Sequence, residues 1–374
     1  MVRVAIQLAA EARSYKRAAV SMKYTLGHGL SAKSIERFVG QIGLELCHQQ
    51  LLTTSKKDVL VPDVAVVSCD GGRIRTRAQG CGPGVHDPAW NETKNASFEK
   101  MTSTPIQTED PCPELPDTFR QVAHVAKIAE KPAFSVAAEP KTRPKYKGPK
   151  RMLRTCLSSM ACSADFGKQM EREARRRRLH EAPRRVFIGD GLPWNWSIQS
   201  QHFKGFTQIL DFIHALQYAY AAAAQWEDND ESRWQRYLQI AEALWQGKVD
   251  VLIEQLKTAL SGQHVIDALA ANTQTETSAM SDAVRYFTNN RQRMDYPRYR
   301  KEGLPLTSSP MESLIKQINQ RVKGTEMFWN HPEGAEAILQ VRAAHLCEDG
   351  RLEEYLNTRP GSPYARRPQL KLAG

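Results

Sequence analysis

The sequence lacks the features of secreted, membrane-spanning and zinc-binding proteins. Its seven cysteines include no Cys-x-x-Cys pair, which argues against a structural zinc site and for a reducing compartment. No apolar run approaches the roughly 20 residues that span a bilayer, and no basic-then-apolar signal segment opens the chain. Acidic residues are outnumbered by basic ones, 41 to 52, and the net charge of +11 favours a polyanionic partner. We therefore expect a soluble cytoplasmic protein whose 374 residues form two or three domains.

Three acidic residues lie at the ends of predicted strands or at the start of a predicted helix, positions that suit a metal site. Residues 59–69 are β-branched and apolar, which predicts a buried strand that ends at Asp70, before two glycines. A similar strand begins at Val186 and ends at Asp190, and Glu312 opens a predicted helix. Two strand-end aspartates and a helical glutamate suit Mg²⁺, and two such ions stabilise the attacking and leaving oxygens of phosphoryl transfer.

Each acid also has a purely structural interpretation. Asp70 before Gly-Gly and Asp190 between two glycines would both suit turns. Ser309, Pro310 and Glu312 fit a helix start with a capping box. The order of the three acids, with a long and mostly helical segment before the last, favours a three-carboxylate nuclease or transposase site.

Residues 1–52 are predicted to be helical. A break at residues 27–29 separates Ala9–Leu26 from a second helix, for which Ser31 is the expected N-cap. Lys33 and Arg37 are predicted on the exposed face of that helix. This pattern suits a helix-turn-helix DNA reader, and it equally suits an ordinary helical hairpin packed on the core.

Basic residues recur near the acids. Residues 73–77 alternate, which predicts a second strand with Arg73 and Arg75 on one face, then a turn at Gly80–Pro88 and a third strand at Trp90–Phe98. The run Arg175, Arg176, Arg177 and Arg178 covers all sides of a helix, so it is predicted to be either a solvated charge run or a DNA-backbone contact. Lys316 and Lys323 share a polar stripe with Glu312, and with Arg321 they complete the DNA-contact candidates.

Prolines punctuate residues 101–183 and leave room for at most short helices, at Phe119–Ile128 and Met160–Arg178. Further helices are predicted at Phe206–Gln225, Trp234–Leu260, Thr277–Arg291, Ala335–Leu346 and Leu352–Thr358. Asp211 and His214 lie at i and i+3 on the first of these. No third ligand is spaced nearby, so we expect a polar pair directed at the site, or a buried hydrogen bond, rather than a separate metal site.

Five blocks follow one another along the chain: Ser68–Arg75, Trp90–Lys94, Gly189–Trp194, Leu210–Ala215 and Met311–Trp329. Together they resemble the blocks of bacterial insertion-sequence transposases of the ISKra type, which are distantly related to Mutator-like elements. The resemblance covers roughly residues 15–100 and 185–357. It implies an α/β (α+β) fold: an RNase H-like mixed sheet flanked by helices, with a large all-helical insertion and an N-terminal helical DNA-binding region.

The resemblance also implies an activity. Asp70, Asp190 and Glu312 would be the catalytic triad and would hold two Mg²⁺ (or Mn²⁺) ions. Water would cut double-stranded DNA at the element ends, and the freed 3′-hydroxyl would attack target DNA. Asp211 and His214 match an Asp-x-x-His signature and are, with Trp194, accessory candidates. We expect a homo-oligomer on DNA, associated with a bacterial nucleoid.

The expected division is a helical DNA-binding region, the first part of the core, a Pro-rich basic segment, the second core strand, a helical insertion and the closing helices: 1–56, 57–100, 101–183, 184–204, 205–304 and 305–374. A competing function is a truncated or domesticated transposase that binds DNA without catalysis. The intact acids favour the enzyme, whereas an N-terminal region shorter than is usual in the family favours the binding protein. A plain RNase H-like nuclease is disfavoured, because it needs neither a long insertion nor a separate DNA reader.

Overall fold

The structure of the protein is a computed structural model, and it describes residues 1–52, 60–77, 89–104, 106–137, 143, 145–269, 278–324 and 328–359. The predicted turn at Gly80–Pro88 and the tail after Arg359 lie outside these ranges. None of the described helices is long and apolar enough to cross a membrane.

A five-stranded mixed sheet forms the centre of the molecule, in the order β3-β2-β1-β4-β5. Its strands are β1 (Val64–Thr76), β2 (Ala89–Thr102), β3 (Lys150–Ser159), β4 (Arg184–Gly189) and β5 (Thr207–Leu210). β1 pairs antiparallel with β2 and parallel with β4, and β5 is parallel to β4. The predicted mixed α/β fold with helices flanking a mixed sheet is thus confirmed.

β1 is longer than predicted. It does not end at Asp70 but continues through Gly71 and Gly72 to Thr76, paired with β2 along its whole length. The predicted turn after Asp70 and the separate second strand at residues 73–77 are therefore wrong. Gly72 has a packing role instead, since a Cβ there would lie 2.7 Å from Thr93 Oγ1 on β2. Glycine is common in loops, but inside a strand it can also mark a position where a neighbouring side chain or backbone approaches closely.

Two strands lie where the sequence predicted none. β3 occupies part of the Pro-rich segment, ahead of the 14-residue helix α5 (Ser163–Arg176), which confirms the helix predicted at Met160–Arg178. β5 takes up the first residues of the helix predicted from Phe206, because Ile209 and Leu210 are buried beside β4. A short apolar run does not distinguish a strand from a helix until its neighbour is known.

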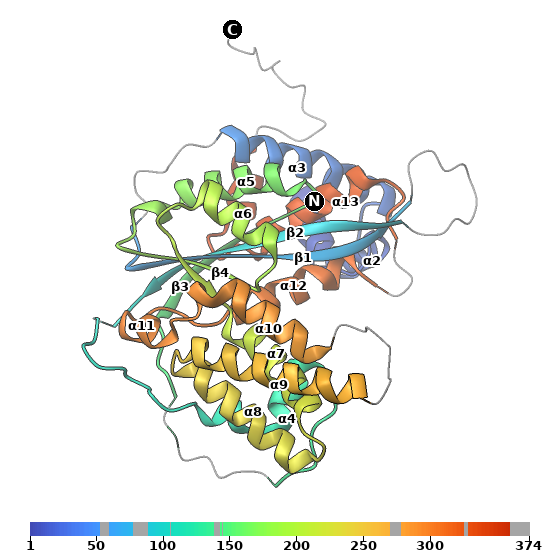
Figure 1. The fold of residues 1–374 in the computed structure, drawn as a ribbon. Coiled ribbons are helices and arrows are strands. Elements are labelled where there is room, and N and C mark those ends of the chain that lie inside the picture. Colours follow the sequence, from blue (N-terminus) through green and yellow to red (C-terminus); the bar gives the residue numbers. More distant parts are fainter. Residues whose placement is uncertain are drawn as a thin grey trace.

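The remaining helices form three groups in Figure 1. Those near the sheet and the N-terminus are α1 (Val2–Glu11), α2 (Tyr15–Leu26), α3 (Ala32–Leu52), α6 (Pro193–His202), α12 (Ser309–Val322), α13 (Pro332–Leu346) and α14 (Arg351–Thr358). A lower lobe contains α4 (Val122–Ala129), α7 (Phe212–Trp226), α8 (Asp230–Trp245), α9 (Val249–Leu269) and α10 (Ala279–Asn290). The short helix α11 (Tyr296–Lys301) leads back to the sheet, and 3₁₀ turns lie at Asp117–Arg120, Leu179–Glu181 and Arg291–Arg293.

The helix predicted at Trp234–Leu260 is two helices, α8 and α9. Gly247 separates them with a φ of 71°, a left-handed conformation that favours glycine. The segment after Asp190 was expected to be a turn followed by aromatics, but it begins a helix, α6, with Pro193 in its first turn.

The N-terminal helices pack on the core. Gly27 ends α2 in a left-handed conformation, and the Ser34 amide donates to Ser31 Oγ (3.1 Å), which confirms the predicted break and cap. Ile35 and Phe38 on α3 belong to one apolar cluster with α12, α13 and α14. The packed helical hairpin, one of the two alternatives, is therefore what the structure contains, whereas DNA reading by this region stays a prediction.

Candidate acidic site

Three aspartates lie level with one another at three neighbouring parallel strands: Asp70 within β1, Asp190 directly after β4 and Asp211 directly after β5. The last paired residues of β1 and β4 are Ser68 and Ile188, and Asp70 and Asp190 each follow two residues later in the chain. On the other side of β4, Gly189 pairs with Leu210, so Asp211 follows at the level of Asp190. Because adjacent strands lie about 4.8 Å apart, the fold brings the three aspartates into one row.

Asp70 and Glu312 line one cavity of about 620 Å³, together with His214 from α7 and Lys316 from α12. Burial raises the pKa of Asp70 to about 6, and the nearby charge of Asp190 and, to a smaller degree, of Glu312 adds to that rise. The first and third predicted acids therefore face the same space. Their mutual repulsion is the electrostatic condition that a bound cation would relieve.

Asp190 is held by the turn that follows it. Its Oδ1 accepts hydrogen bonds from the Leu192 amide (3.0 Å) and from Asn195 Nδ2 (2.6 Å), while Tyr286 Oη donates to its carbonyl oxygen (2.6 Å). Burial raises the pKa of Asp190. The Oδ1 atom of Asp190 is thus occupied by donors from the turn and α6, and Tyr286 on α10 holds the backbone carbonyl of Asp190 in place.

Asp211 connects the sheet to the helix that carries Glu312. Its fully buried carboxylate caps α7 through the Ile213 amide (2.8 Å) and accepts from both the amide (3.1 Å) and the hydroxyl of Ser308, where α12 begins. Its Oδ2 also lies 3.2 Å from His214 Nδ1. The predicted hydrogen bond between Asp211 and His214 is present, and this aspartate is a positioning residue for α12.

His214 is a cation among carboxylates. Burial alone would lower its pKa, but the hydrogen bond and charge of Asp211, with the charges of Asp190 and Asp70, raise it to about 9. Three carboxylates thus act on one imidazolium. His214 is therefore positively charged at neutral pH and partly offsets the charge of Asp70 and Glu312 on the cavity wall.

The donors suit a hard divalent cation in type, since carboxylate oxygens are what Mg²⁺ prefers. Within the described ranges, however, no group of three or more His, Cys, Asp or Glu side chains is arranged to hold a metal ion. Asp70, Asp190 and Glu312 are neighbours in this structure without forming a closed ligand set.

The expected DNA contacts fall into two classes. Arg73, Lys33, Arg37, Lys316 and Lys323 are exposed, and Arg75 is half-buried against Trp90. By contrast, Arg176, Arg177 and Arg321 are buried within the fold, and their contact with DNA stays a prediction. Arg321 Nε donates to the Ala9 carbonyl (2.6 Å), and its guanidinium lies over the rings of Tyr15 and Trp329.

In the arginine run, α5 ends at Arg176, so the four residues do not share one helix. Arg176 and Arg177 bind the buried carboxylate of Glu173. Arg175 pairs with Glu171 (2.8 Å) and Arg178 with Glu181 (2.5 Å) nearer the surface. The run is neither a uniformly solvated surface nor a uniform DNA contact.

Sequence reasoning missed three residues that shape the site: Asn195, Tyr286 and Ser308. Asn195 joins Asp190 to the Cys69 thiol, which donates to Asn195 Oδ1 (3.3 Å) on the sheet face opposite Asp70. The signal for Ser308 was its position beside the predicted helix start. Trp194 is partly buried and packs against the main core.

Replacing Asp70 with asparagine should stabilise the metal-free protein. A carboxylate whose pKa is raised to about 6 is disfavoured by the fold at every pH above that value, and asparagine removes the charge. At pH 8 we expect a gain of about 1 to 2 kcal/mol in the free energy of unfolding, measured by urea denaturation in EDTA. Asp63→Asn, an exposed residue just before β1, should change nothing. A loss of stability in the Asp70→Asn protein would contradict the repulsion inferred here.

Replacing Asp211 with alanine should destabilise the fold, because the Ser308 and Ile213 groups lose a buried acceptor. We expect a loss of about 3 kcal/mol in the free energy of unfolding. Asp282→Ala, which removes an ion pair to Arg285 at the surface, is the matched control and should cost less than about 1 kcal/mol. Equal losses in the two variants would show that Asp211 does not anchor α12.

Comparison with known proteins gives no assignment: no protein-family model matches the chain, and no curated protein matches it significantly.

Proposed function

We propose that this chain has an RNase H-like core and is a DNA transposase that transfers phosphoryl groups with the help of divalent metal. One observation carries the proposal: Asp70 and Asp190 stand level on adjacent parallel strands, and Glu312 lines the same cavity as Asp70. The mixed sheet flanked by helices and the helical lobe before the last acid are also what the resemblance to ISKra-type transposases implies.

Asp70, Asp190 and Glu312 would hold two Mg²⁺ (or Mn²⁺) ions, which would activate water and stabilise the leaving 3′-oxygen. The chain's own residues prepare that site. Asn195 and the Leu192 amide fix one oxygen of Asp190. Asp211 fixes the start of α12 and thereby the position of Glu312.

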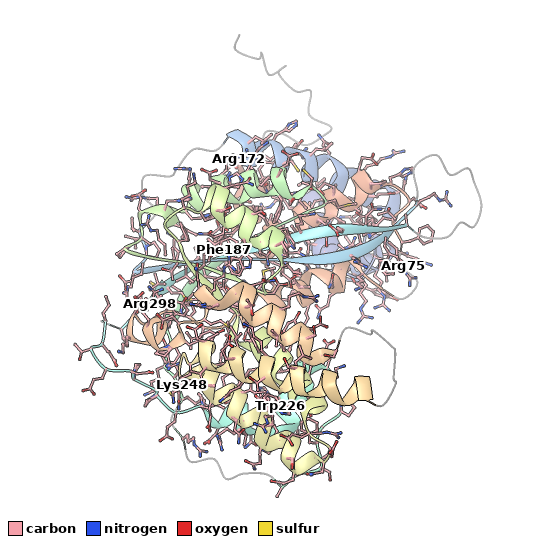
Figure 2. All side chains as sticks on the ribbon, in the orientation of Figure 1. Arg75, Arg172, Phe187, Trp226, Lys248 and Arg298 are labelled. Carbon is pink, nitrogen blue, oxygen red and sulfur yellow. The ribbon has the colours of Figure 1, made fainter. Side chains whose placement is uncertain are left out.

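Exposed basic residues lie where a DNA backbone would pass. Lys316 is one helical turn from Glu312, and its side chain is 78% exposed. Near the end of β1 and the start of β2, Arg75 and Lys323 lie 4.8 and 6.0 Å from the ring centre of the exposed Trp90. Figure 2 shows Arg75 at the right-hand end of the sheet in that view. Cations around an exposed indole suit a phosphate backbone and unstacked bases.

A second function has a specific observation in its favour. Because no ligand set is closed among the described residues, a domesticated transposase that binds DNA without cutting it would also retain this arrangement. Such a protein would keep the basic surface and the fold, and it would show no metal-dependent chemistry.

The test is cleavage of end-labelled double-stranded DNA that carries the element ends. Wild type is incubated at protein concentrations that saturate the DNA in a gel-shift assay, with Mg²⁺, with Mn²⁺ or with EDTA. We expect 3′-hydroxyl ends and strand-transfer products with either metal and none with EDTA. Saturated binding without cleavage in all three conditions would reject the enzyme and support the binding protein.

A further inference from the structure

Two cysteines from distant parts of the chain meet at the edge of the sheet. Cys156 lies on β3, Cys347 directly follows α13, and both are free thiols. Their Sγ atoms are 3.8 Å apart, and the two residues are 1% and 5% exposed. A disulfide bond measures about 2.05 Å, so the sulfurs need to approach by roughly 1.8 Å to form one.

The backbone holds the two residues in register. The turn between α13 and α14 runs beside the outer edge of β3: the Glu348 amide donates to the Arg154 carbonyl (2.9 Å), and the Arg154 amide donates to Glu348 Oε2 (2.7 Å). Two residues further along β3, the Cys156 amide donates to Cys347 Sγ (3.2 Å). Both sulfurs also lie near the Ala343 carbonyl, at 3.2 and 3.1 Å.

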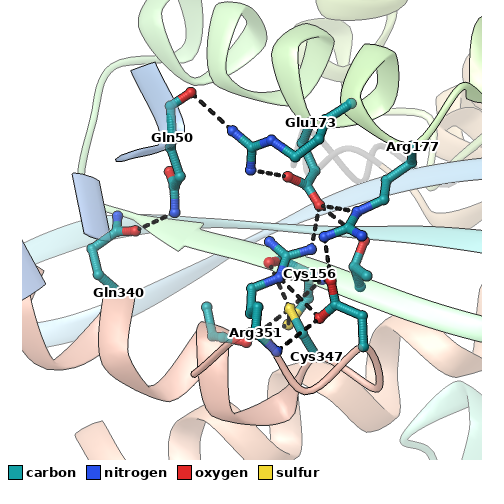
Figure 3. Close-up of polar contacts among 11 residues, drawn as sticks. Gln50, Cys156, Glu173, Arg177, Gln340, Cys347 and Arg351 are labelled. Atoms are coloured by element: carbon teal, nitrogen blue, oxygen red, sulfur yellow. Dashed lines mark hydrogen bonds and ion pairs between the residues drawn. The ribbon is translucent and has the colours of Figure 1, made fainter. Parts of the chain in front are cut away.

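The surroundings of Cys347 favour a thiolate. Figure 3 shows Arg351 and Arg177 beside the pair, gathered around Glu173. Burial by itself raises the pKa of Cys347, but its hydrogen bond with Cys156 and the charge of Arg351 hold that pKa below its ordinary value. The same hydrogen bond, with burial, holds the pKa of Cys156 well above it. The two sulfurs therefore differ, one as a nucleophile and the other as a protonated partner.

A small molecule can reach Cys156, whose sulfur lies 3.8 Å from that of Cys347. A cavity of about 430 Å³ is lined by Cys156, Ala344, Arg177, Arg351 and, from α3, Gln50. Hydrogen peroxide is far smaller than this space. Two cysteines that served only as small core residues would require neither a neighbouring guanidinium nor an amide directed at one sulfur.

We propose that Cys156 and Cys347 form a dithiol that peroxide oxidises to a disulfide, joining β3 to the end of α13. The proposal is independent of the DNA chemistry at the acidic site.

The oxidation balances in two steps. The Cys347 thiolate attacks one peroxide oxygen, the O–O bond breaks, and hydroxide leaves and takes a proton, so Cys347 becomes a sulfenic acid. The Cys156 sulfur then attacks the Cys347 sulfur. The S–O bond breaks, and the departing hydroxide takes the Cys156 proton to form a second water. Two thiols are oxidised to a disulfide, and one peroxide is reduced to two waters.

The bond would close a loop that contains β4, β5, the lower-lobe helices α7 to α10, and α12. Cross-linking a long loop restricts the unfolded chain, so the oxidised protein should be the more stable form. For a chain of this length we expect its Tm to rise by about 5 °C, an increase that dithiothreitol reverses.

The test uses the full-length native protein. It is treated with hydrogen peroxide, blocked with N-ethylmaleimide, unfolded, digested with trypsin and mapped by mass spectrometry. We expect one dithiothreitol-sensitive cross-linked peptide pair that joins Cys156 to Cys347, together with the rise in Tm. Because the mapping is done on wild type, the result does not depend on whether a cysteine variant folds.

Two variants sharpen the result. Cys162→Ser, which removes an exposed thiol three residues beyond β3, should leave both the cross-link and the rise in Tm intact. Cys347→Ser should abolish both. The proposal is overturned if Cys156 and Cys347 remain alkylatable after unfolding at a peroxide dose that oxidises Cys162. Cross-linking of either residue to another cysteine would overturn it as well.

Discussion

Asp190→Ala should reduce metal-dependent DNA cleavage by about a thousandfold or more while leaving DNA binding unchanged. The proposed chemistry places the attacking water and the leaving oxygen on ions held by three carboxylates, and removing one ligand removes charge stabilisation that acts in the transition state. Asp190 lies between Asp70 and Asp211 in the row of three aspartates, so its replacement removes the carboxylate at the centre of that row. The measurement is the single-turnover rate on end-labelled DNA at saturating protein.

Two controls accompany this variant. Asp250→Ala removes an exposed aspartate that pairs with Arg291 on the helical lobe and should keep the wild-type rate. Gel-shift affinity and Tm of the Asp190→Ala protein show whether it is folded and bound. Cleavage at the wild-type rate by a folded, DNA-bound Asp190→Ala protein would remove this residue from the reaction and with it the three-acid site.

Glu173→Gln should lower the free energy of unfolding by about 3 to 5 kcal/mol, the largest stability effect we expect. The Glu173 carboxylate is 1% exposed and lies 2.8, 3.1 and 2.5 Å from nitrogens of Arg176, Arg177 and Arg351. Glutamine keeps the shape and removes the charge, so three guanidinium groups are left with Asp349 as their remaining anion. Urea denaturation at pH 7 measures the loss.

Glu171→Gln is the matched control, since Glu171 lies on the same helix but is partly exposed and pairs with Arg175. It should cost less than about 1 kcal/mol. The three arginines hold the pKa of Glu173 far below its ordinary value, despite the opposing effect of burial. Its stabilisation is therefore complete above about pH 5 and is lost as the pH falls. The gap between wild type and Glu173→Gln should narrow in acid, and a gap that widens would contradict this account.

The parts of the fold and site that could be predicted have strong local signals. Runs of β-branched residues before Asp70 and Asp190 identified β1 and β4, and apolar spacing identified α12 with Glu312 near its start. The Asp211–His214 pair was visible as an i, i+3 spacing. These signals do not depend on distant neighbours, and the structure brings Asp70, His214 and Glu312 to one cavity, with Asp190 and Asp211 in the same row as Asp70.

The rest depended on partners far away in the sequence. β3 forms because β2 and the turn at Glu348 supply its hydrogen bonds, and β5 forms beside β4. The burial of Arg177 depends on its ion pair with Asp349, and no local sequence pattern around Arg177 predicts so distant a partner. A local hint for Glu173 did exist, because it precedes Arg176 and Arg177 by three and four residues, the spacing of helical ion pairs.

The pairing of β1 with β4 also has a consequence for synthesis on the ribosome. β1 is made early, but its parallel partner lies beyond the whole of β2, β3 and α5, and Glu312 comes later still. Parallel pairing of such remote segments is slow, because a long loop must close before the contacts form. A nascent chain that has emerged only as far as α5 holds one of the three acids of the proposed site. Completion of the site is thus postponed until nearly the whole polypeptide has left the tunnel.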